Sequence, residues 1–250
     1  MTRVGFLYPG SSAEDDYKAF EELLGKDVEL PVVHTPLRDD RHRLDTLLEA
    51  GSEESLVKGA QEMAALNVEA VVQACAGSGF VHGWKGARRQ VEWVRNTTGT
   101  PASSTSCAFV HALARLRLSR VAIAATYPDE ISQRLVEFLS EAGVTVVSVA
   151  DHDVTSAAEV AHLDPNEVLD FVISNDHPRA ETVLVPDTAL HSAHLIDPME
   201  ALLGKTVLTA NQVSVWEGLR LAGRTAPRAG GPGMLFRAGS AAVTSVLPPG

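Results

Sequence analysis

The sequence predicts an α/β protein with two pseudo-symmetric halves, each built around a mostly parallel sheet, and with an active-site cleft between them. Three observations lead to this prediction. Apolar runs alternate with helical patterns along the chain, stretches of the first half are echoed in the second, and one apolar run in each half ends at a reactive side chain. Because parallel sheets bind ligands beyond the carboxyl ends of their strands, both run ends point to one site.

The apolar runs are short and rich in β-branched residues, as buried parallel strands are. The first run follows Met1, is too short for a signal peptide, and is interpreted as a strand. The predicted strands are residues 4–8, 29–34, 70–74, 121–125, 144–149, 182–185 and 206–209.

Helical patterns with recognisable ends lie between these runs. Asp164 and Pro165 supply an N-cap and a first-turn proline, while Gly143 and Gly204 each follow the last residue of a helical pattern. The predicted helices are residues 14–24, 52–66, 86–97, 107–116, 128–142, 165–174, 196–203 and 213–222. The Gly- and Pro-rich tail, residues 224–250, is predicted to pack through its apolar residues without forming a helix.

Three pairs of stretches repeat each other in the same order and at about the same separation, which indicates two related halves. The pairs are residues 3–9 with 120–128, the run ending at Cys75 with the run ending at Asp187, and residues 99–106 with 204–211. We therefore expect three regions. They are an N-terminal α/β subdomain over residues 1–115, a C-terminal α/β subdomain over 116–212, and a helix and tail over 213–250 that pack back on the N-terminal half.

Composition excludes several functions. A net charge of −11 disfavours nucleic acid and anionic membranes as partners, since both require a basic face. No apolar run approaches the ~18–20 residues that span a bilayer. Only two cysteines are present, Cys75 and Cys107, which favours a reducing, cytoplasmic location and argues against a disulfide framework.

Metal binding is not indicated either. The chain has no CxxC or HExxH spacing, and although His191 and His194 could share a helix face, no third ligand has an obvious place. A solvated helix surface is the favoured interpretation. The charged runs 14–16 and 38–43 are also interpreted as solvated.

The most informative stretch ends at Cys75 and continues into the small residues 76–79. Backbone N–H groups of Ala76, Gly77 and Ser78 can approach a bound carboxylate closely, because little side-chain bulk surrounds them. Asp187 ends the corresponding strand of the second half. A Cys75 thiolate facing a protonated Asp187 would form a nucleophile and proton-transfer pair that needs no cofactor.

Structural alternatives exist for both residues. Cys75 could be a small, inert residue buried at a strand end, and Asp187 could cap the helix that follows it. The position of Cys75 before a glycine-rich loop, with a partner in the other half, favours a functional role. For Asp187 the two interpretations are evenly balanced.

These residues resemble the aspartate/glutamate racemase superfamily, and within it the branch of maleate cis–trans isomerases and arylmalonate decarboxylases. The matching stretches are residues 8–12, 75–78, 125–130, 195–203 and 204–212. The resemblance implies two Rossmann-like subdomains, an interdomain cleft, no cofactor, no metal and a homodimer or higher homo-oligomer.

The resemblance also implies roles for the two strand-end residues. In maleate isomerases a cysteine at the position of Cys75 adds to the substrate's double bond, and a second cysteine in the other half handles the proton. In arylmalonate decarboxylases the first position is glycine, and the second cysteine protonates an enediolate. This chain keeps the first cysteine but has Asp187 at the second position, and Cys107, at the start of a different helix, is no simple substitute.

Further residues are expected to bind the substrate. Tyr127 resembles the family tyrosine that holds a carboxylate, although it could instead pack as a half-buried aromatic residue. Ser11 and Ser12 follow the first strand, and Ser12 takes the place of a family asparagine; its alternative role is an N-cap. Thr188 and Ala189 can offer amides across the cleft. The hydroxyl cluster 103–106 could bind an anion or cap a helix.

The sequence thus predicts a cofactor-independent isomerase of a small unsaturated dicarboxylic acid, similar to maleate isomerase. Cys75 is the expected nucleophile and Asp187 the proton donor and acceptor. The alternatives are a decarboxylase or other lyase acting through an enediolate, an Asp/Glu-type racemase or epimerase, and a non-catalytic protein that binds a small anion.

Overall fold

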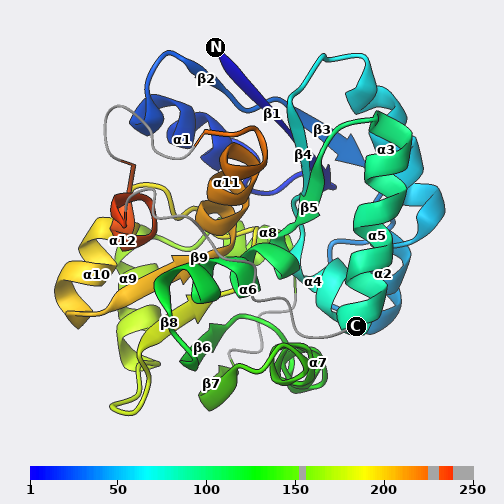
Figure 1. Cartoon of the computed structure of the whole chain (residues 1–250). Coiled ribbons are helices and arrows are strands. Elements are labelled where there is room, and N and C mark those ends of the chain that lie inside the picture. The colour runs from blue at the N-terminus through cyan, green and yellow to red at the C-terminus, as the bar shows by residue number, and fades with distance from the viewer. Residues whose placement is uncertain (152–155, 225–230, 239–250) are drawn as a thin grey trace.

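Two all-parallel sheets form the framework of the computed structural model, which describes residues 1–151, 156–224 and 231–238. The first sheet contains β1 (Thr2–Pro9), β2 (Val28–Glu29), β3 (Val32–Thr35), β4 (Ala70–Gln73) and β5 (Ala102–Ser104). The second contains β6 (Arg120–Ala125), β7 (Thr145–Asp151), β8 (Thr182–Val185) and β9 (Thr206–Thr209). In Figure 1 the first sheet lies in the upper part of the molecule and the second in the lower part. The predicted fold class is confirmed.

Both sheets have the same topology. β1 lies between β4 and the β2/β3 edge, with β5 beyond β4; β6 likewise lies between β7 and β8, with β9 beyond β8. Cys75 and Asp187 each lie two residues past the end of the corresponding strand, β4 and β8. The echoes predicted from the sequence therefore correspond to equivalent structural positions.

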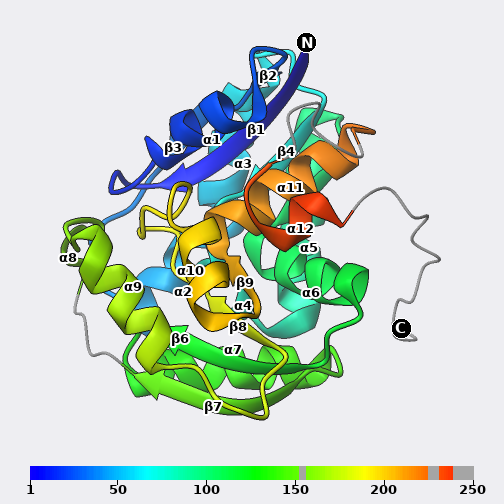
Figure 2. The ribbon, with the colours of Figure 1, turned by 90° about the vertical axis from the view of Figure 1, so that its left-hand side faces the viewer.

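Helices cover both faces of the two sheets (Figures 1 and 2). Their bounds are α1 (Asp16–Leu24), α2 (Leu44–Ala50), α3 (Glu53–Ala64), α4 (Ala76–Phe80), α5 (Gly83–Thr98), α6 (Thr105–Leu116), α7 (Asp129–Glu141), α8 (Ala157–Ala161), α9 (Pro165–Ser174), α10 (Ile196–Leu203), α11 (Ala210–Leu221) and α12 (Gly233–Arg237). Asp164 forms the predicted cap, as part of a capping box with Glu167. None of the helices described is long and apolar enough to cross a bilayer.

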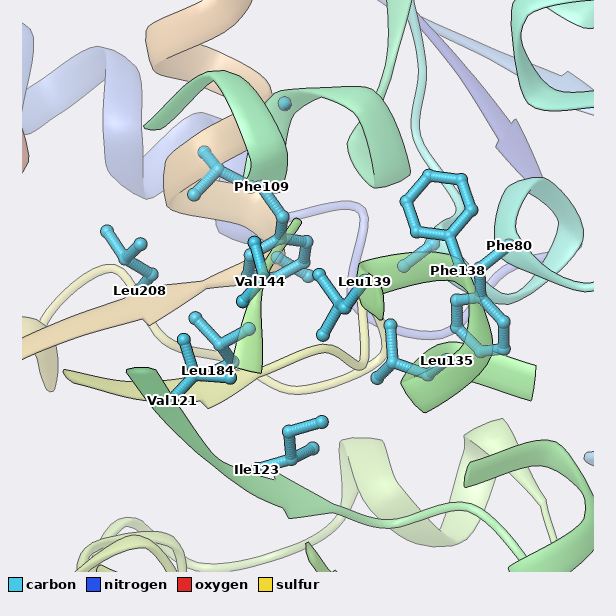
Figure 3. Packing of buried hydrophobic residues seen from close by; sticks show 14 of the residues in the cluster. Phe80, Phe109, Val121, Ile123, Leu135, Phe138, Leu139, Val144, Leu184 and Leu208 are labelled. Atoms are coloured by element: carbon cyan, nitrogen blue, oxygen red, sulfur yellow. The ribbon is translucent and has the colours of Figure 1, made fainter. Parts of the chain in front are cut away.

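Burial on both faces explains the continuous apolar runs of the strands. Alternate residues of β1 and β4 pack into two hydrophobic clusters on opposite faces of the sheet. One cluster includes residues of α3 and α5, and the other includes residues of α1 and α11. A further cluster joins the two halves, because Phe80 of α4 and Phe109 of α6 pack with β6, β8 and α7 (Figure 3). The second sheet is thus covered partly by helices of the first half.

Several local predictions were wrong. The tail contains a five-residue helix, α12, whose Leu235 and Phe236 are buried, so packing overrides the Gly/Pro composition; the apolar residues 241–243 lie outside the described residues. His191 and His194 lie in the loop and turn before α10, so they do not share a helix face. Four short elements that carry little periodic signal were not predicted: α2, α4, α8 and β5.

The segment after β9 spans the two halves. α11 contacts β1, β4 and β5 of the first sheet, while α12 contacts β9 and α10 of the second. The subdomain boundaries at residues 115 and 212 stay a prediction.

We predict that the Gly218→Val substitution lowers the free energy of unfolding by about 1–3 kcal/mol, because it overpacks a tight helix–sheet contact. A Cβ on Gly218 of α11 would overlap Val4 Cγ1 and lie 3.3 Å from Val72 Cγ2. Urea unfolding measures the effect. Ala114→Val, on the exposed side of α6, is the control and should change stability much less; equal losses for both variants would contradict the packing argument.

Candidate active site

A small cavity of about 50 Å³ lies beyond the carboxyl ends of strands from both sheets. Residues after β1, β4, β6 and β8 line it, and the segment 37–50 and Ala157 of α8 complete its wall. Cys75 and Asp187 both line this cavity. The structure therefore brings together the two residues that the sequence singled out.

Cys75 is the N-cap residue of α4. Its side chain is buried, with 8% of the residue exposed, and Sγ accepts a hydrogen bond from Ser78 N at 3.5 Å. Burial raises the pKa of the Cys75 thiol; hydrogen bonds from Ser78 and from Gly77 N lower it, and the nearby Asp187 raises it further. The cavity thus disfavours two negative charges at once.

Glycines fix the position of α4. A Cβ on Gly77 would lie 2.9 Å from Leu47 Cδ2, and one on Gly79 would overlap Ser106 Oγ. The small residues 76–79 therefore let α4 pack closely between α2 and α6. Of the predicted anion-binding residues here, Gly77 lines the cavity. Ala76 lies in the core, and the Ser78 hydroxyl bonds Gln73 Nε2 and the Cys75 carbonyl.

Asp187 is a buried carboxyl group, 4% exposed, with partners on three sides. Thr126 Oγ1 donates to Oδ2 at 2.5 Å, Ala189 N donates to Oδ1 at 2.9 Å, and His42 Nε2 lies 3.4 Å from Oδ2. The helix-capping alternative is wrong, because α10 does not begin until Ile196. Asp187 instead closes a turn at the cavity wall.

His42 was missed by the sequence analysis, which interpreted residues 38–43 as a solvated charge run. In the structure His42 is buried, with 7% of the residue exposed, and it lines the cavity. Its ring packs edge-on against the ring of Tyr127, with the two ring centroids 5.0 Å apart. Its Nδ1 atom is buried and has no hydrogen-bond partner among the residues that the structure describes. A signal was available: the segment follows β3, so it lies at the same sheet edge as Cys75.

Two tyrosines support the cavity wall. The Tyr127 hydroxyl donates to Pro186 O at 3.0 Å, and the Tyr8 hydroxyl donates to Thr188 O at 3.1 Å. Burial raises the pKa of both phenols, so both remain protonated donors. Tyr8 was not predicted as a site residue, although it ends the first strand.

Ser12 lies against the Tyr8 hydroxyl, at 2.6 Å, and lines the cavity. Its alternative role as an N-cap is wrong, since Asp15 precedes α1. Ser11 is exposed and outside the cavity lining, whereas Thr188 and Ala189 line it. The cluster 103–106 also lies outside the lining, and Ser104 caps α6 by accepting from Cys107 N.

The run 14–16 is not wholly solvated either. Asp16 is 3% exposed and accepts hydrogen bonds from Ser192 N, Ala193 N and Asn211 Nδ2, at 3.1, 3.0 and 2.8 Å. Asn211 Nδ2 also lies within hydrogen-bond distance of Thr188 O, at 3.2 Å. This buried network fixes the loop that follows Asp187.

Charges at the cavity are mixed. Asp39, Asp40 and Asp187 line it together with Arg41, which is paired with Asp39. Over the described ranges, no group of three or more His, Cys, Asp or Glu residues is arranged to hold a metal ion. The chemistry available from these side chains is nucleophilic addition and proton transfer.

Comparisons with known proteins agree with this fold. A model of the family described as arylmalonate decarboxylase matches residues 46–236. The chain is 28% identical over 145 residues to the arylmalonate decarboxylase of Bordetella bronchiseptica, a stretch covering 57% of this chain and 60% of that protein. It is 23% identical over 147 residues to the maleate isomerase of Geobacillus stearothermophilus, covering 58% of each. These matches span about three fifths of the curated relatives.

A solved structure extends the likeness to almost the whole chain. A mutant of the maleate cis–trans isomerase of Nocardia farcinica, with a covalently bound succinylcysteine intermediate, is similar with a TM-score of 0.82 and 22% identity. The likeness covers 96% of this chain and 99% of that one. At this identity it shows a common fold.

We predict that Thr126→Val lowers the free energy of unfolding by about 1–3 kcal/mol, because it removes a hydrogen bond to a buried carboxyl group without changing side-chain volume much. Thr126→Ser keeps the hydroxyl, so its free energy of unfolding should fall less. Urea unfolding of both variants measures the difference; a valine variant as stable as the serine variant would show that this contact contributes nothing.

We predict that both cysteines react slowly with iodoacetamide at neutral pH, because the thiolate is the reactive form. Burial raises the pKa of Cys75 and raises that of Cys107 to about 11. Alkylation should keep accelerating above about pH 9, and Cys75, which lines the cavity, should react before Cys107. Peptide mass spectrometry measures both rates, with unfolded protein as the control. A Cys75 rate that levels off near pH 7 would contradict this assignment.

Proposed function

The chain belongs to the arylmalonate decarboxylase family, and from this premise we propose that it is a cofactor-independent isomerase of a small unsaturated dicarboxylic acid. Cys75 is the proposed nucleophile, and Asp187 the proposed proton donor and acceptor. One observation carries the proposal: a free thiol and a carboxyl group, each following an equivalent strand in opposite halves, line the same cavity.

The proposed reaction needs only these groups. Cys75 Sγ adds as thiolate to one alkene carbon, so a C–S bond forms and the π electron pair moves to the neighbouring carbon. That carbon takes a proton from Asp187, and the former double bond rotates as a single bond. Asp187 then removes the proton, the double bond reforms, and the C–S bond breaks to release the trans acid.

The substrate carboxylates are proposed to bind at hydroxyl and amide groups. Tyr127 and Ser12 supply hydroxyls on two sides of the cavity, while Gly77, Thr188 and Ala189 supply backbone amides. Ser11 and Ala76, outside the cavity lining, are proposed to act through their backbone N–H groups, whereas the Ser78 N–H donates to Cys75 Sγ and is proposed to position the nucleophile. Such local donors are required because the net charge of −11 repels a dianion at long range.

Cavity size supports the isomerase over its main competitor. The cavity is about 50 Å³, against the ~150 Å³ that holds a benzene molecule in an engineered core. A substrate with an aryl ring would therefore require a larger displacement of Leu47 and Tyr127 than a four-carbon diacid. The succinylcysteine intermediate of the Nocardia farcinica isomerase is the adduct that Cys75 would form with maleate.

A decarboxylase is the second candidate, and the sequence comparison favours it. Identity is higher to the arylmalonate decarboxylase, 28%, than to the maleate isomerase, 23%. In that reaction a malonate would lose carbon dioxide and Asp187 would protonate the enediolate. A racemase, or a protein that only binds a small anion, is a further outcome that the experiment below distinguishes.

We predict that the protein converts maleate to fumarate and that Cys75→Ser abolishes this turnover while maleate still binds, because only the thiolate adds to the alkene. Proton NMR in deuterated water, with maleate, phenylmalonate and amino acids as substrates, separates isomer exchange, loss of carboxylate and α-deuteration. Cys107→Ser is the control and should remain active. Full activity of Cys75→Ser would exclude the mechanism, and carbon dioxide release from phenylmalonate alone would identify the lyase.

A further inference from the structure

We propose that His42 is a catalytic residue and that it works with Asp187 as one proton-transfer unit. In this unit the imidazole exchanges the proton with the substrate, and the carboxylate orients the ring and balances its charge. The inference rests on the proposed isomerisation and deepens it, because it reassigns the proton-transferring atom from Asp187 to its histidine partner.

The contacts around His42 point to a pair aimed at the cavity. Nε2 lies 3.4 Å from Asp187 Oδ2, and the two side chains are only 6% and 4% exposed. Both residues line the cavity that Cys75 also lines. At this distance, the electrostatic interaction between an acid and a base is stronger in a site shielded from water than it is between exposed groups.

The surroundings determine which atom does the chemistry. Asp187 already accepts hydrogen bonds from Thr126 Oγ1 on Oδ2 and from Ala189 N on Oδ1, so a donor holds each of its oxygens in place. His42 Nδ1 is buried, and within the described ranges 1–151, 156–224 and 231–238 no residue hydrogen-bonds to it. With its proton on Nε2, the atom nearest the carboxylate, the ring leaves Nδ1 as the basic nitrogen.

Buried polar atoms without a partner are uncommon and require an explanation. The edge-on contact with Tyr127, at 5.0 Å, and the position of His42 between the Arg41–Ser156 bridge and the N-cap of α2 hold the ring at the cavity. Because no described residue satisfies Nδ1, we infer that its partner is the reacting group.

The proton balance then closes without an outside acid. The imidazole takes the thiol proton of Cys75 as Sγ bonds to one alkene carbon, and the resulting imidazolium delivers that proton from Nδ1 to the carbon that receives the π electron pair. After rotation Nδ1 removes a proton from that carbon, the C–S bond breaks, and the thiolate regains its proton. The cavity carries one imidazolium beside its carboxylate while the substrate carbon holds the electron pair displaced by addition of Sγ.

The test is a double-mutant cycle with maleate as the substrate. His42→Gln and Asp187→Asn should each lower kcat by about 10²–10⁴-fold, the usual contribution of general acid–base catalysis, with a much smaller change in KM. If the two residues act as one unit, kcat of the double variant should fall no further than kcat of the less active single variant. Losses that multiply, or a fully active His42→Gln variant, would overturn the proposal.

A matched control and a substrate-free measurement complete the test. His191 pairs with Asp15 at 2.7 Å on the surface, outside the cavity, so His191→Gln should leave turnover unchanged. Nitrogen-15 NMR of the ligand-free wild-type protein should show His42 protonated at Nε2 and unprotonated at Nδ1. The opposite tautomer would contradict the proposed pairing of His42 with Asp187. If the wild-type protein is inactive on maleate, the proposed isomerisation is refuted. The His42 tautomer then tests, independently of activity, whether His42 and Asp187 form the proposed pair.

Discussion

A carboxyl group removed from water must be given hydrogen-bond donors, and this requirement shapes the cavity. Asp187 satisfies it with two donors, Thr126 after β6 and the amide of Ala189 in its own turn, while His42 from the loop after β3 lies 3.4 Å from Oδ2. Asp16 meets the same requirement at the other side of the Asp187 loop, through Asn211 and the amides of residues 192 and 193. Both carboxylates therefore tie segments of the two halves together.

Most of the fold could be predicted from the sequence because it depends on local patterns. Apolar runs mark strands buried on both faces, and Asp164 and Gly204 mark helix ends where the structure has them. The elements that were missed, such as α4 and α12, are five residues long and are stabilised by neighbours that are distant in sequence, including Leu47 and Ser106 at α4. Periodicity cannot reveal an element whose stability comes from tertiary packing.

The site was predictable where it lies directly after a strand. Cys75 and Asp187 could be placed at one cavity because both follow apolar runs that occupy equivalent positions in the two halves. His42 could not be found in the same way, since its neighbours are charged and the local composition is that of a solvated loop. Burial of that histidine results from the second half closing over the first, as does the pairing of Arg41 with Ser156. Asp16 was misjudged for the same reason.

The glycines of α4 have an evolutionary consequence. Gly77 and Gly79 let the backbone of this short helix lie against the side chains of Leu47 and Ser106, so its packing involves the side chain at position 75 only through the Cys75 Sγ contacts with Ser78 N and Gly77 N. A change there alters the chemistry without requiring the chain to refold. Nucleophilic and non-nucleophilic enzymes can then diverge from a common ancestor by single substitutions, with the cost in stability confined to one small side chain.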